Sequence, residues 1–169
     1  MTILDILNYP DPRLHKVASS VDKINSEIIS IVRDMTETMY AAPGIGLSAT
    51  QVNYHKKIII IDISEKKDDL LVLINPEIIR SDGQQESQEG CLSVPGIYET
   101  VKRASEISIR ALNIKGDLIE FEVDGKLSIC IQHEMDHLMG KVFVEYLSPL
   151  KKSRIKIKMI KKNKKFEAD

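Results

Sequence analysis

The sequence lacks any hydrophobic run that approaches the roughly 18 apolar residues of a membrane-spanning helix. Its amino terminus carries Asp5 and lacks the basic stretch with which a secretory signal begins. These absences argue against a membrane partner and against export. We therefore expect a cytoplasmic protein.

Cysteine is scarce, and internal repeats and low-complexity linkers are missing. Cys91 and Cys130 could form one disulfide, but thiols in an intracellular chain more often serve metal binding or catalysis. The 169 residues can bury one hydrophobic core, and no change of composition marks a domain boundary. We therefore predict a single catalytic domain over residues 1–169. No stretch has the pattern of a dimerising coiled coil, so the oligomeric state stays open.

Charge is balanced over the whole chain but not along it. The net charge is −1, yet residues 151–169 carry eight lysines and Arg154 against Glu167 and Asp169, a net charge of about +7. The preceding residues therefore carry about −8. A basic tail on an acidic body indicates an anionic partner for the tail alone.

Two histidines lie four residues apart in the segment His133-Glu134-Met135-Asp136-His137. One helical turn separates them, so both imidazoles could bind one metal ion. Glu134 would lie beside that ion without binding it and could accept a proton from a water molecule. A charged helix could also carry these residues on a solvated face by chance. The apolar neighbours argue against this alternative, because two unpaired buried histidines would be costly; they are Leu127, Ile129, Cys130, Ile131 and Leu138.

Hydrophobic periodicity predicts an α+β fold. Two prolines make the first twenty residues an irregular arm, and apolar residues at helical spacing predict a helix over residues 25–40. Short aliphatic or alternating runs predict strands over 58–63, 70–74, 105–114 and 118–123. The tail alternates like a strand, but its lysines also suit a helix, which we favour. We expect antiparallel strands packed around a buried central metal-binding helix, with an N-terminal helix and a basic C-terminal helix.

A catalytic metal site usually has three protein ligands and one open position. Metzincin peptidases place a third histidine six residues after the second, where this chain has Phe143. Other peptidases use a distant downstream glutamate as the third ligand, and the candidates here are chiefly Glu145 and Glu167. Upstream, Cys91 follows Gly90 in a segment typical of a rigid loop, and a thiolate is a strong ligand for zinc or ferrous iron. A lone cysteine is more often a small buried hydrophobic residue, so its spacing alone leaves the third ligand undecided.

Three segments, in this order and spacing, resemble the signature motifs of bacterial peptide deformylases. They are Gly44-Ile45-Gly46-Leu47-Ser48-Ala49-Thr50-Gln51, Glu89-Gly90-Cys91-Leu92-Ser93 and Gln132-His133-Glu134-Met135-Asp136-His137. The resemblance covers nearly the whole chain and is strongest to the type found in Gram-negative bacteria. It implies a hydrolase that removes the formyl group from the N-terminal formylmethionine of nascent proteins and releases formate.

The resemblance also implies roles for single residues. Glu134 would act as general base and then as general acid, and Gln51 with the Leu92 amide would form the oxyanion hole. One divalent metal ion is implied, usually Fe²⁺ in the family and replaceable by nickel, cobalt or zinc. The basic tail, residues 151–169, would dock on the ribosome as in relatives, and no DNA partner is implied. Three residues would hold the metal: Cys91, His133 and His137.

Substrate recognition needs an apolar pocket for the methionine beside the metal. Gly46 would bring the backbone close enough to pair with the peptide as an added strand. Glu89 and Arg103 resemble charged positions that brace the site in relatives, and we expect an ion pair between them. Without the resemblance, the three residues expected to line the pocket would be interpreted as ordinary core: Ile45, Ile129 and Cys130.

Two positions depart from the family pattern. Ser48 replaces the usual alanine and adds a hydroxyl that needs a partner if buried, and Tyr98 stands where relatives often carry arginine.

Two other functions compete with this interpretation. A zinc peptidase would lack its usual third ligand here. A metal-stabilised module that binds nucleic acid through its basic tail would leave Glu134 and Gln51 without a task.

Overall fold

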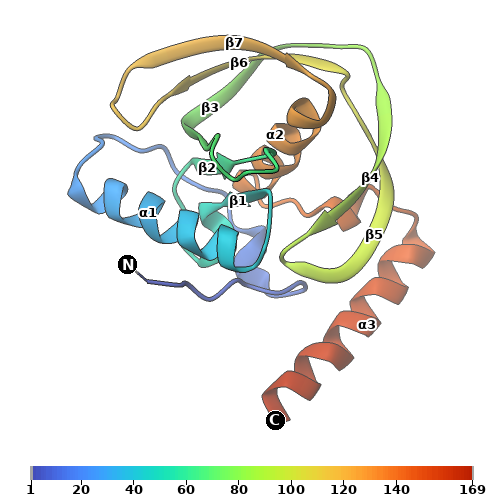
Figure 1. Cartoon of the computed structure of the whole chain (residues 1–169). Coiled ribbons are helices and arrows are strands. Elements are labelled where there is room, and N and C mark those ends of the chain that lie inside the picture. The colour runs from blue at the N-terminus through green and yellow to red at the C-terminus, as the bar shows by residue number, and fades with distance from the viewer. Residues whose placement is uncertain (1, 169) are drawn as a thin grey trace.

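The computed structural model describes residues 2–168, with side chains up to residue 165. The described residues form three α-helices, a five-stranded sheet and a separate β-hairpin. Figure 1 shows how these elements are arranged. The helices are α1 (Ser26–Ala41), α2 (Gly125–Leu138) and α3 (Pro149–Ala168), and the 3-10 helices are η1 (Pro12–His15), η2 (Ala49–Val52) and η3 (Phe143–Tyr146). The strands are β1 (Gly46–Ser48), β2 (Ile58–Ile61), β3 (Leu71–Asp82), β4 (Gln85–Cys91), β5 (Val94–Arg103), β6 (Glu106–Leu112) and β7 (Leu118–Asp124).

The larger sheet is antiparallel throughout, with strand order β1-β2-β3-β6-β7. Strand β2 consists of four buried isoleucines because helices cover both of its faces. Ile58 and Ile60 pack in the cluster around α1, whereas Ile59 and Ile61 pack in the cluster around α2. Alternate residues of a strand point to opposite faces, so an unbroken aliphatic run fits a strand that is covered on both sides.

Helix α2 is buried against this sheet and contacts β1, β2, β6 and β7. Ile131 and Leu138 anchor it in the core that it shares with these strands. The helix is followed by a residue in the left-handed conformation: Gly140 has φ of 78°, its N–H donates to the His137 carbonyl, and the Lys141 N–H donates to the Asp136 carbonyl. Asp124 is the N-cap residue of this helix, but its side chain makes no capping hydrogen bond.

The hairpin of β4 and β5 forms a second, two-stranded sheet beside α2 (Figure 1). The sequence prediction missed both strands and assigned Cys91 to a rigid loop. The residue ends β4 instead, next to the turn into β5. Strand β3 is also longer than predicted, because it continues past a register shift at Asn75 and Pro76 to Asp82. The α+β class itself is as predicted.

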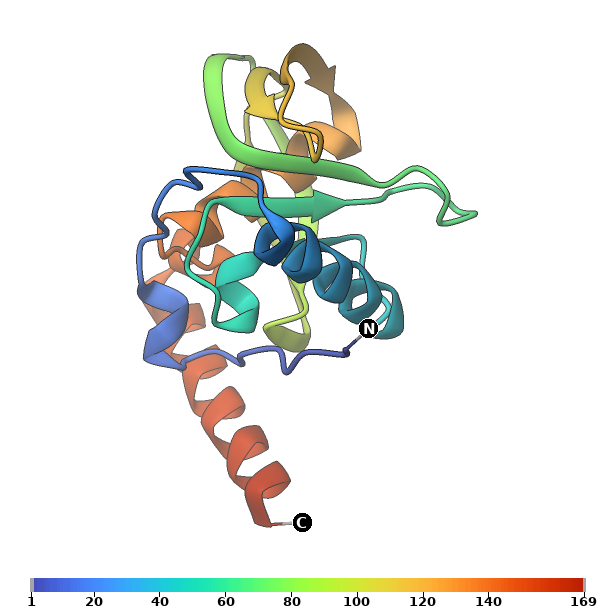
Figure 2. The ribbon, with the colours of Figure 1, turned by 90° about the vertical axis from the view of Figure 1, so that its left-hand side faces the viewer.

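From residue 2 onward, the amino-terminal arm is irregular except for the short helix η1, as the prolines predicted. The tail is helical, as favoured, and Figure 2 shows α3 leading away from the body. Ile155 and Met159 attach α3 to a core cluster that also contains Phe143 of η3. Among the described residues, none of the helices is long and apolar enough to span a membrane.

We predict that Gly140→Ala destabilises the fold more than Gly125→Ala does. Both glycines have positive φ, which costs another residue about 1–2 kcal/mol. A Cβ at Gly140 would also lie 2.5 Å from the backbone oxygen of His15, whereas one at Gly125 would meet nothing within 4 Å. Denaturant unfolding should give a loss of about 1 kcal/mol for Gly125→Ala and more than about 2 kcal/mol for Gly140→Ala. Equal losses would contradict the predicted clash.

Candidate active site

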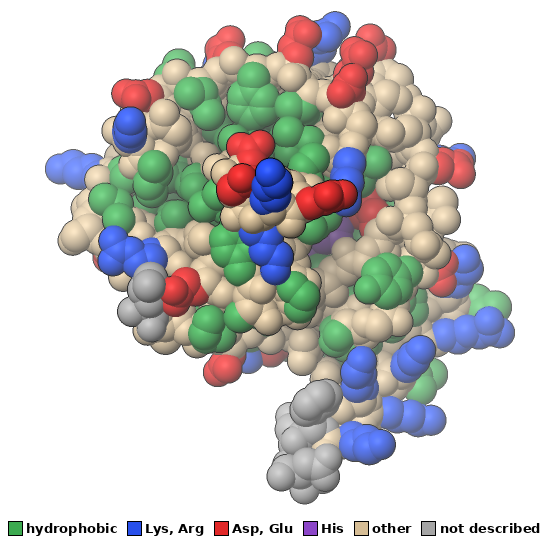
Figure 3. All heavy atoms as spheres, viewed as in Figure 1, with side chains coloured by type: hydrophobic (Ala, Val, Ile, Leu, Met, Phe, Trp, Pro, Cys, Tyr) green, Lys and Arg blue, Asp and Glu red, His purple; other side chains and the backbone are tan. Residues whose placement is uncertain are grey.

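Three parts of the fold meet around a cavity of about 970 Å³. Helix α2, the β4–β5 turn and the segment leading into β1 supply most of its walls. Figure 3 shows histidine at the bottom of a hollow bordered by hydrophobic and charged side chains. Nine of the predicted site residues line the cavity: Ile45, Gly46, Glu89, Cys91, Leu92, Ile129, Cys130, His133 and Glu134. Gln51 and His137 do not line it, but both contact the sulfur of Cys91.

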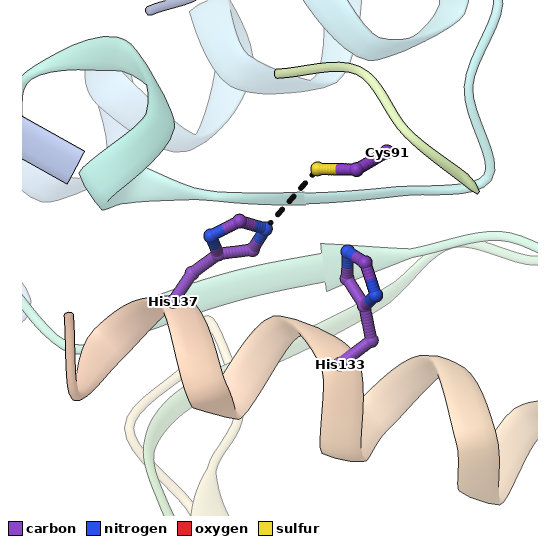
Figure 4. Close-up of side chains that lie close together, drawn as sticks. All are labelled: Cys91, His133 and His137. Atoms are coloured by element: carbon purple, nitrogen blue, oxygen red, sulfur yellow. Dashed lines mark hydrogen bonds between the residues drawn. The ribbon is translucent and has the colours of Figure 1, made fainter. Parts of the chain in front are cut away.

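Cys91, His133 and His137 come together as one cluster. Their potential ligand atoms all lie within 4.8 Å of one another, and the Cys91 Sγ lies 3.3 Å from the His137 Nε2 (Figure 4). The two imidazole rings are 5.0 Å apart, as expected for one turn of helix. His137 is fully buried and His133 is 7% exposed. Sulfur and imidazole nitrogen together suit zinc, iron and similar divalent metals.

The electrostatics of this cluster favour a positive charge. Burial alone would lower the pKa of His133, but contacts with Cys91, Glu134 and Glu89 outweigh it and raise the pKa well above its usual range. Burial lowers the pKa of His137 well below its usual range, so that imidazole is neutral, as a ligand must be. A divalent cation would supply the positive charge that the anionic groups around His133 favour. The residues present therefore fit a metal ion.

Glu134 is a buried carboxyl beside this cluster. Burial raises its pKa to about 7, and its Oε1 has no hydrogen-bond partner among the described protein groups. Gly46 allows the carboxylate to lie close to β1, since a Cβ there would be 2.5 Å from the Glu134 Oε2. A carboxyl with a pKa near neutrality can both accept and release a proton at physiological pH.

Gln51 is buried, with 1% exposure, and its amide is held at both ends. The Ser48 N–H donates to its Oε1 at 3.0 Å, and the Ser48 hydroxyl lies 3.3 Å from the same oxygen. The hydroxyl that departs from the family pattern thus has a buried partner. At the other end, the Gln51 Nε2 donates to the Ser93 hydroxyl at 3.0 Å and lies 3.4 Å from the Cys91 sulfur. One amide hydrogen therefore points toward the cluster.

The expected ion pair between Glu89 and Arg103 is confirmed and is bidentate. The Arg103 Nε and one terminal nitrogen each donate to Glu89 at 2.8 Å, and the other terminal nitrogen donates to the Asp136 Oδ2 at 2.6 Å. Burial would raise the pKa of Glu89, but hydrogen bonds from Arg103 and His133 lower it to about 2. An ionised Glu89 can only accept, so the His133 Nδ1 must donate to it at 2.8 Å. This leaves the Nε2 of His133 free to bind a metal.

The cavity walls combine apolar and polar side chains, and among them Lys126 was not indicated by the sequence. Cys130 behaves as a small hydrophobic residue, because burial raises the pKa of its thiol to about 12. Lys126, in the first turn of α2, also lines the cavity. Tyr98 borders the opening and packs over Gly90, where a Cβ would lie 2.5 Å from its ring.

Sequence reasoning gave no role to Ser93, Asp136 or Phe143. Ser93 lies two residues after Cys91 and receives the Gln51 amide, and Asp136 lies within the histidine motif and pairs with Arg103. Proximity to the motifs was therefore a signal for these two. Phe143 occupies the position of a metzincin ligand, but its ring stacks on His133 with centroids 6.0 Å apart. That contact is made through the fold, and no local pattern indicates it.

A thiol and two imidazoles, beside a buried carboxyl at the bottom of an apolar cavity, define a candidate mononuclear metallohydrolase. The comparisons with known proteins give the family. The family model described as polypeptide deformylase matches residues 3–153. Peptide deformylase 2 of Nitrosomonas europaea is 63% identical over 161 residues, which cover 95% of this chain and 87% of that protein. Peptide deformylase 1 of Burkholderia multivorans is 62% identical over 162 residues, which cover 95% of this chain and 90% of that protein.

A solved structure agrees with these relatives. The crystal structure of a peptide deformylase from Legionella pneumophila has a TM-score of 0.93 and 42% identity, and the match covers 99% of this chain and 98% of that one. The chain belongs to the polypeptide deformylase family and is an enzyme of that family.

We predict that the buried Arg103 stabilises the fold far more than a matched exposed arginine. Arg103→Gln leaves Glu89 and Asp136 as uncompensated charges, which should lower the free energy of unfolding by about 3–5 kcal/mol. Arg110 also contacts a glutamate at 2.7 Å, but both side chains are nearly half exposed, so Arg110→Gln should leave the free energy of unfolding almost unchanged. Denaturant unfolding of both variants measures the difference, and similar losses would contradict it.

Proposed function

We propose that this enzyme removes the formyl group from the N-terminal formylmethionine of newly synthesised proteins by metal-dependent hydrolysis. The observation that carries the proposal is the cluster of Cys91, His133 and His137 beside Glu134. Among the described residues, three side chains form the ligand group, as a catalytic site with an open position requires. A structural zinc site closed by four protein ligands is less well supported.

The three clustered residues would hold one divalent ion, and Fe²⁺ is the metal that the family resemblance implies. Zinc, nickel and cobalt also accept a thiolate with two imidazoles and could replace it. When bound, such an ion lowers the pKa of a coordinated water molecule toward about 7 and polarises a carbonyl oxygen.

Glu134 would carry the proton through the reaction. Its buried carboxylate accepts a proton from the attacking water at the unpartnered Oε1 and then delivers it to the leaving amine. A pKa of about 7 suits both transfers, because neither protonation state is strongly favoured. Formate and a free methionine amine are the products.

Gln51 and the Leu92 amide would stabilise the charge that develops on the formyl oxygen. The contacts of Ser48 and Ser93 fix the Gln51 amide before the substrate arrives. A donor held in this way needs no reorganisation during the reaction, and one such donor typically contributes about 3–4 kcal/mol to the transition state.

The cavity would hold the methionine side chain. Ile45, Ile129 and Cys130 give it an apolar wall, and burial contributes about 0.8 kcal/mol for each methylene. Gly46 would pair with the peptide backbone, and its position at the start of the sheet-edge strand β1 supports this role. Tyr98 and Lys126 border the same cavity and would contact residues beyond the methionine.

Helix α3 would bring the enzyme to the ribosome. Figure 3 shows lysine and arginine side chains gathered along it. Lys151 pairs with Glu99, and Lys162 donates to the Pro95 carbonyl. The other exposed cations in the described part of α3 could meet phosphates.

We predict that Glu134→Gln retains metal but loses nearly all deformylation. The ligands remain, whereas the amide cannot accept a proton, so turnover of a formyl-Met peptide should fall by about 10²- to 10⁴-fold. Anaerobic metal analysis should show unchanged metal content. Cys91→Ser is the comparison, because loss of a proposed ligand should lower the metal content itself. If Glu134→Gln kept more than about a tenth of wild-type turnover, the general-base role would be wrong.

We predict that removing positive charge from α3 weakens ribosome binding without affecting hydrolysis of a short formyl-Met peptide. Truncation would also remove Ile155 and Met159 from the core, so the charge must be changed on an intact helix. The variant replaces four exposed lysines by glutamine: Lys156, Lys158, Lys161 and Lys164. The matched control replaces four exposed lysines of the body: Lys16, Lys23, Lys115 and Lys141.

Sedimentation with ribosomes at several salt concentrations measures the effect. Each lysine that no longer neutralises a phosphate should reduce the log–log salt slope by roughly 0.7 to 0.9, and the control should keep the wild-type slope. Equal binding by the two variants would reject α3 as the docking element.

A further inference from the structure

A chain of hydrogen bonds leads from the protein surface to the candidate metal ligand His133. It begins at the hydroxyl of Tyr146, which donates to the Asp136 Oδ2 at 2.7 Å. The same carboxylate oxygen receives Arg103 at 2.6 Å, Arg103 holds Glu89 at 2.8 Å, and Glu89 receives His133 at 2.8 Å. All four links are short, and each includes at least one ionised group, which strengthens the bond.

Tyr146 is the exposed end of this chain and lies outside the catalytic cavity. Tyr146 is 49% exposed and does not line the cavity that contains Cys91 and His133. The Arg103 guanidinium lies over its ring at 5.0 Å from the centroid, so Tyr146 contacts two members of the chain. Phe143, from the same short helix η3, stacks on the His133 ring. Helix η3 therefore supports this histidine both directly and through the chain.

We propose that Tyr146 is a positioning residue for His133, acting through Asp136, Arg103 and Glu89. The inference rests on the proposed metal centre. Partners of ligating histidines fix the ring orientation and tautomer and raise the basicity of the ligand nitrogen. Without the Tyr146 hydroxyl, the Asp136 Oδ2 accepts a hydrogen bond from Arg103 only and attracts the guanidinium more strongly. Arg103 then neutralises Glu89 less well, and the orientation of His133 relaxes.

The second histidine offers an internal contrast. The Nδ1 of His137 is buried and has no hydrogen-bond partner among the described groups. Of the two histidines, His133 is therefore the one whose second ring nitrogen is held by a hydrogen bond from the ring to a described group. Loss at the far end of its chain should consequently be visible in metal affinity, although Tyr146 never touches the metal.

The test compares Tyr146→Phe with wild type, using cobalt(II) as the metal. Competition with a chelator should show about 3- to 10-fold weaker cobalt binding by the variant. Asp136→Asn should lose more, and Glu89→Gln, which alters the direct partner, about 10- to 100-fold. Proton NMR of the cobalt-loaded enzyme adds a local signal, because the imidazole N–H of His133 should shift in the same order.

Tyr40→Phe is the matched control. The Tyr40 hydroxyl donates to Asp62, a buried aspartate, at 2.6 Å, so the same substitution removes a similar hydrogen bond outside the chain. Both variants should lose comparable thermal stability, but Tyr40→Phe should bind cobalt as wild type does. Unchanged cobalt affinity and an unshifted His133 signal in Tyr146→Phe would overturn the positioning role. A wild-type enzyme that binds no cobalt would overturn the metal centre as well.

Discussion

The buried guanidinium of Arg103 holds together the two parts of the fold that build the site. Arg103 ends β5, Glu89 lies in β4, and Asp136 lies in α2, so its hydrogen bonds join the small sheet to the central helix. Burying the charges of Arg103 and Glu89 is expensive, and bidentate geometry with several hydrogen bonds offsets that cost. The arrangement therefore fixes β4 relative to α2 more sharply than apolar contact would.

That constraint decides where the thiol lies. Cys91 follows Glu89 by two residues on the same strand, and His133 precedes Asp136 by three on the same helix. With Glu89 and Asp136 held by one side chain, the sulfur and the imidazoles are brought within metal-binding distance. Gly46 in β1 and Gln51 in η2 complete the site on the other side of this cluster. Stability and ligand placement thus depend on the same contacts.

The sequence predicted what local periodicity determines and missed what distant contacts determine. Helical spacing was enough to place His133 and His137 together on α2, and the four isoleucines of β2 identified a buried strand. Strands β4 and β5 were missed because residues 85–89 are polar and the two-stranded sheet buries little on one face, which leaves no hydrophobic alternation to detect. The Tyr146–Asp136 contact was equally hidden, since ten residues and a helix ending separate the two in sequence.

The site also shows how one residue type serves two chemical purposes. Glu89 and Glu134 are both buried, yet the pKa of Glu89 is lowered to about 2 while that of Glu134 is raised to about 7. Burial acts in the same direction on both, so the difference comes from partners: Glu89 receives Arg103 and His133, whereas Glu134 Oε1 receives no donor from the described protein groups. Arg103 binds Glu89 and does not bind Glu134, so Glu89 is held as an anion that orients His133. Glu134 remains able to exchange a proton near neutral pH.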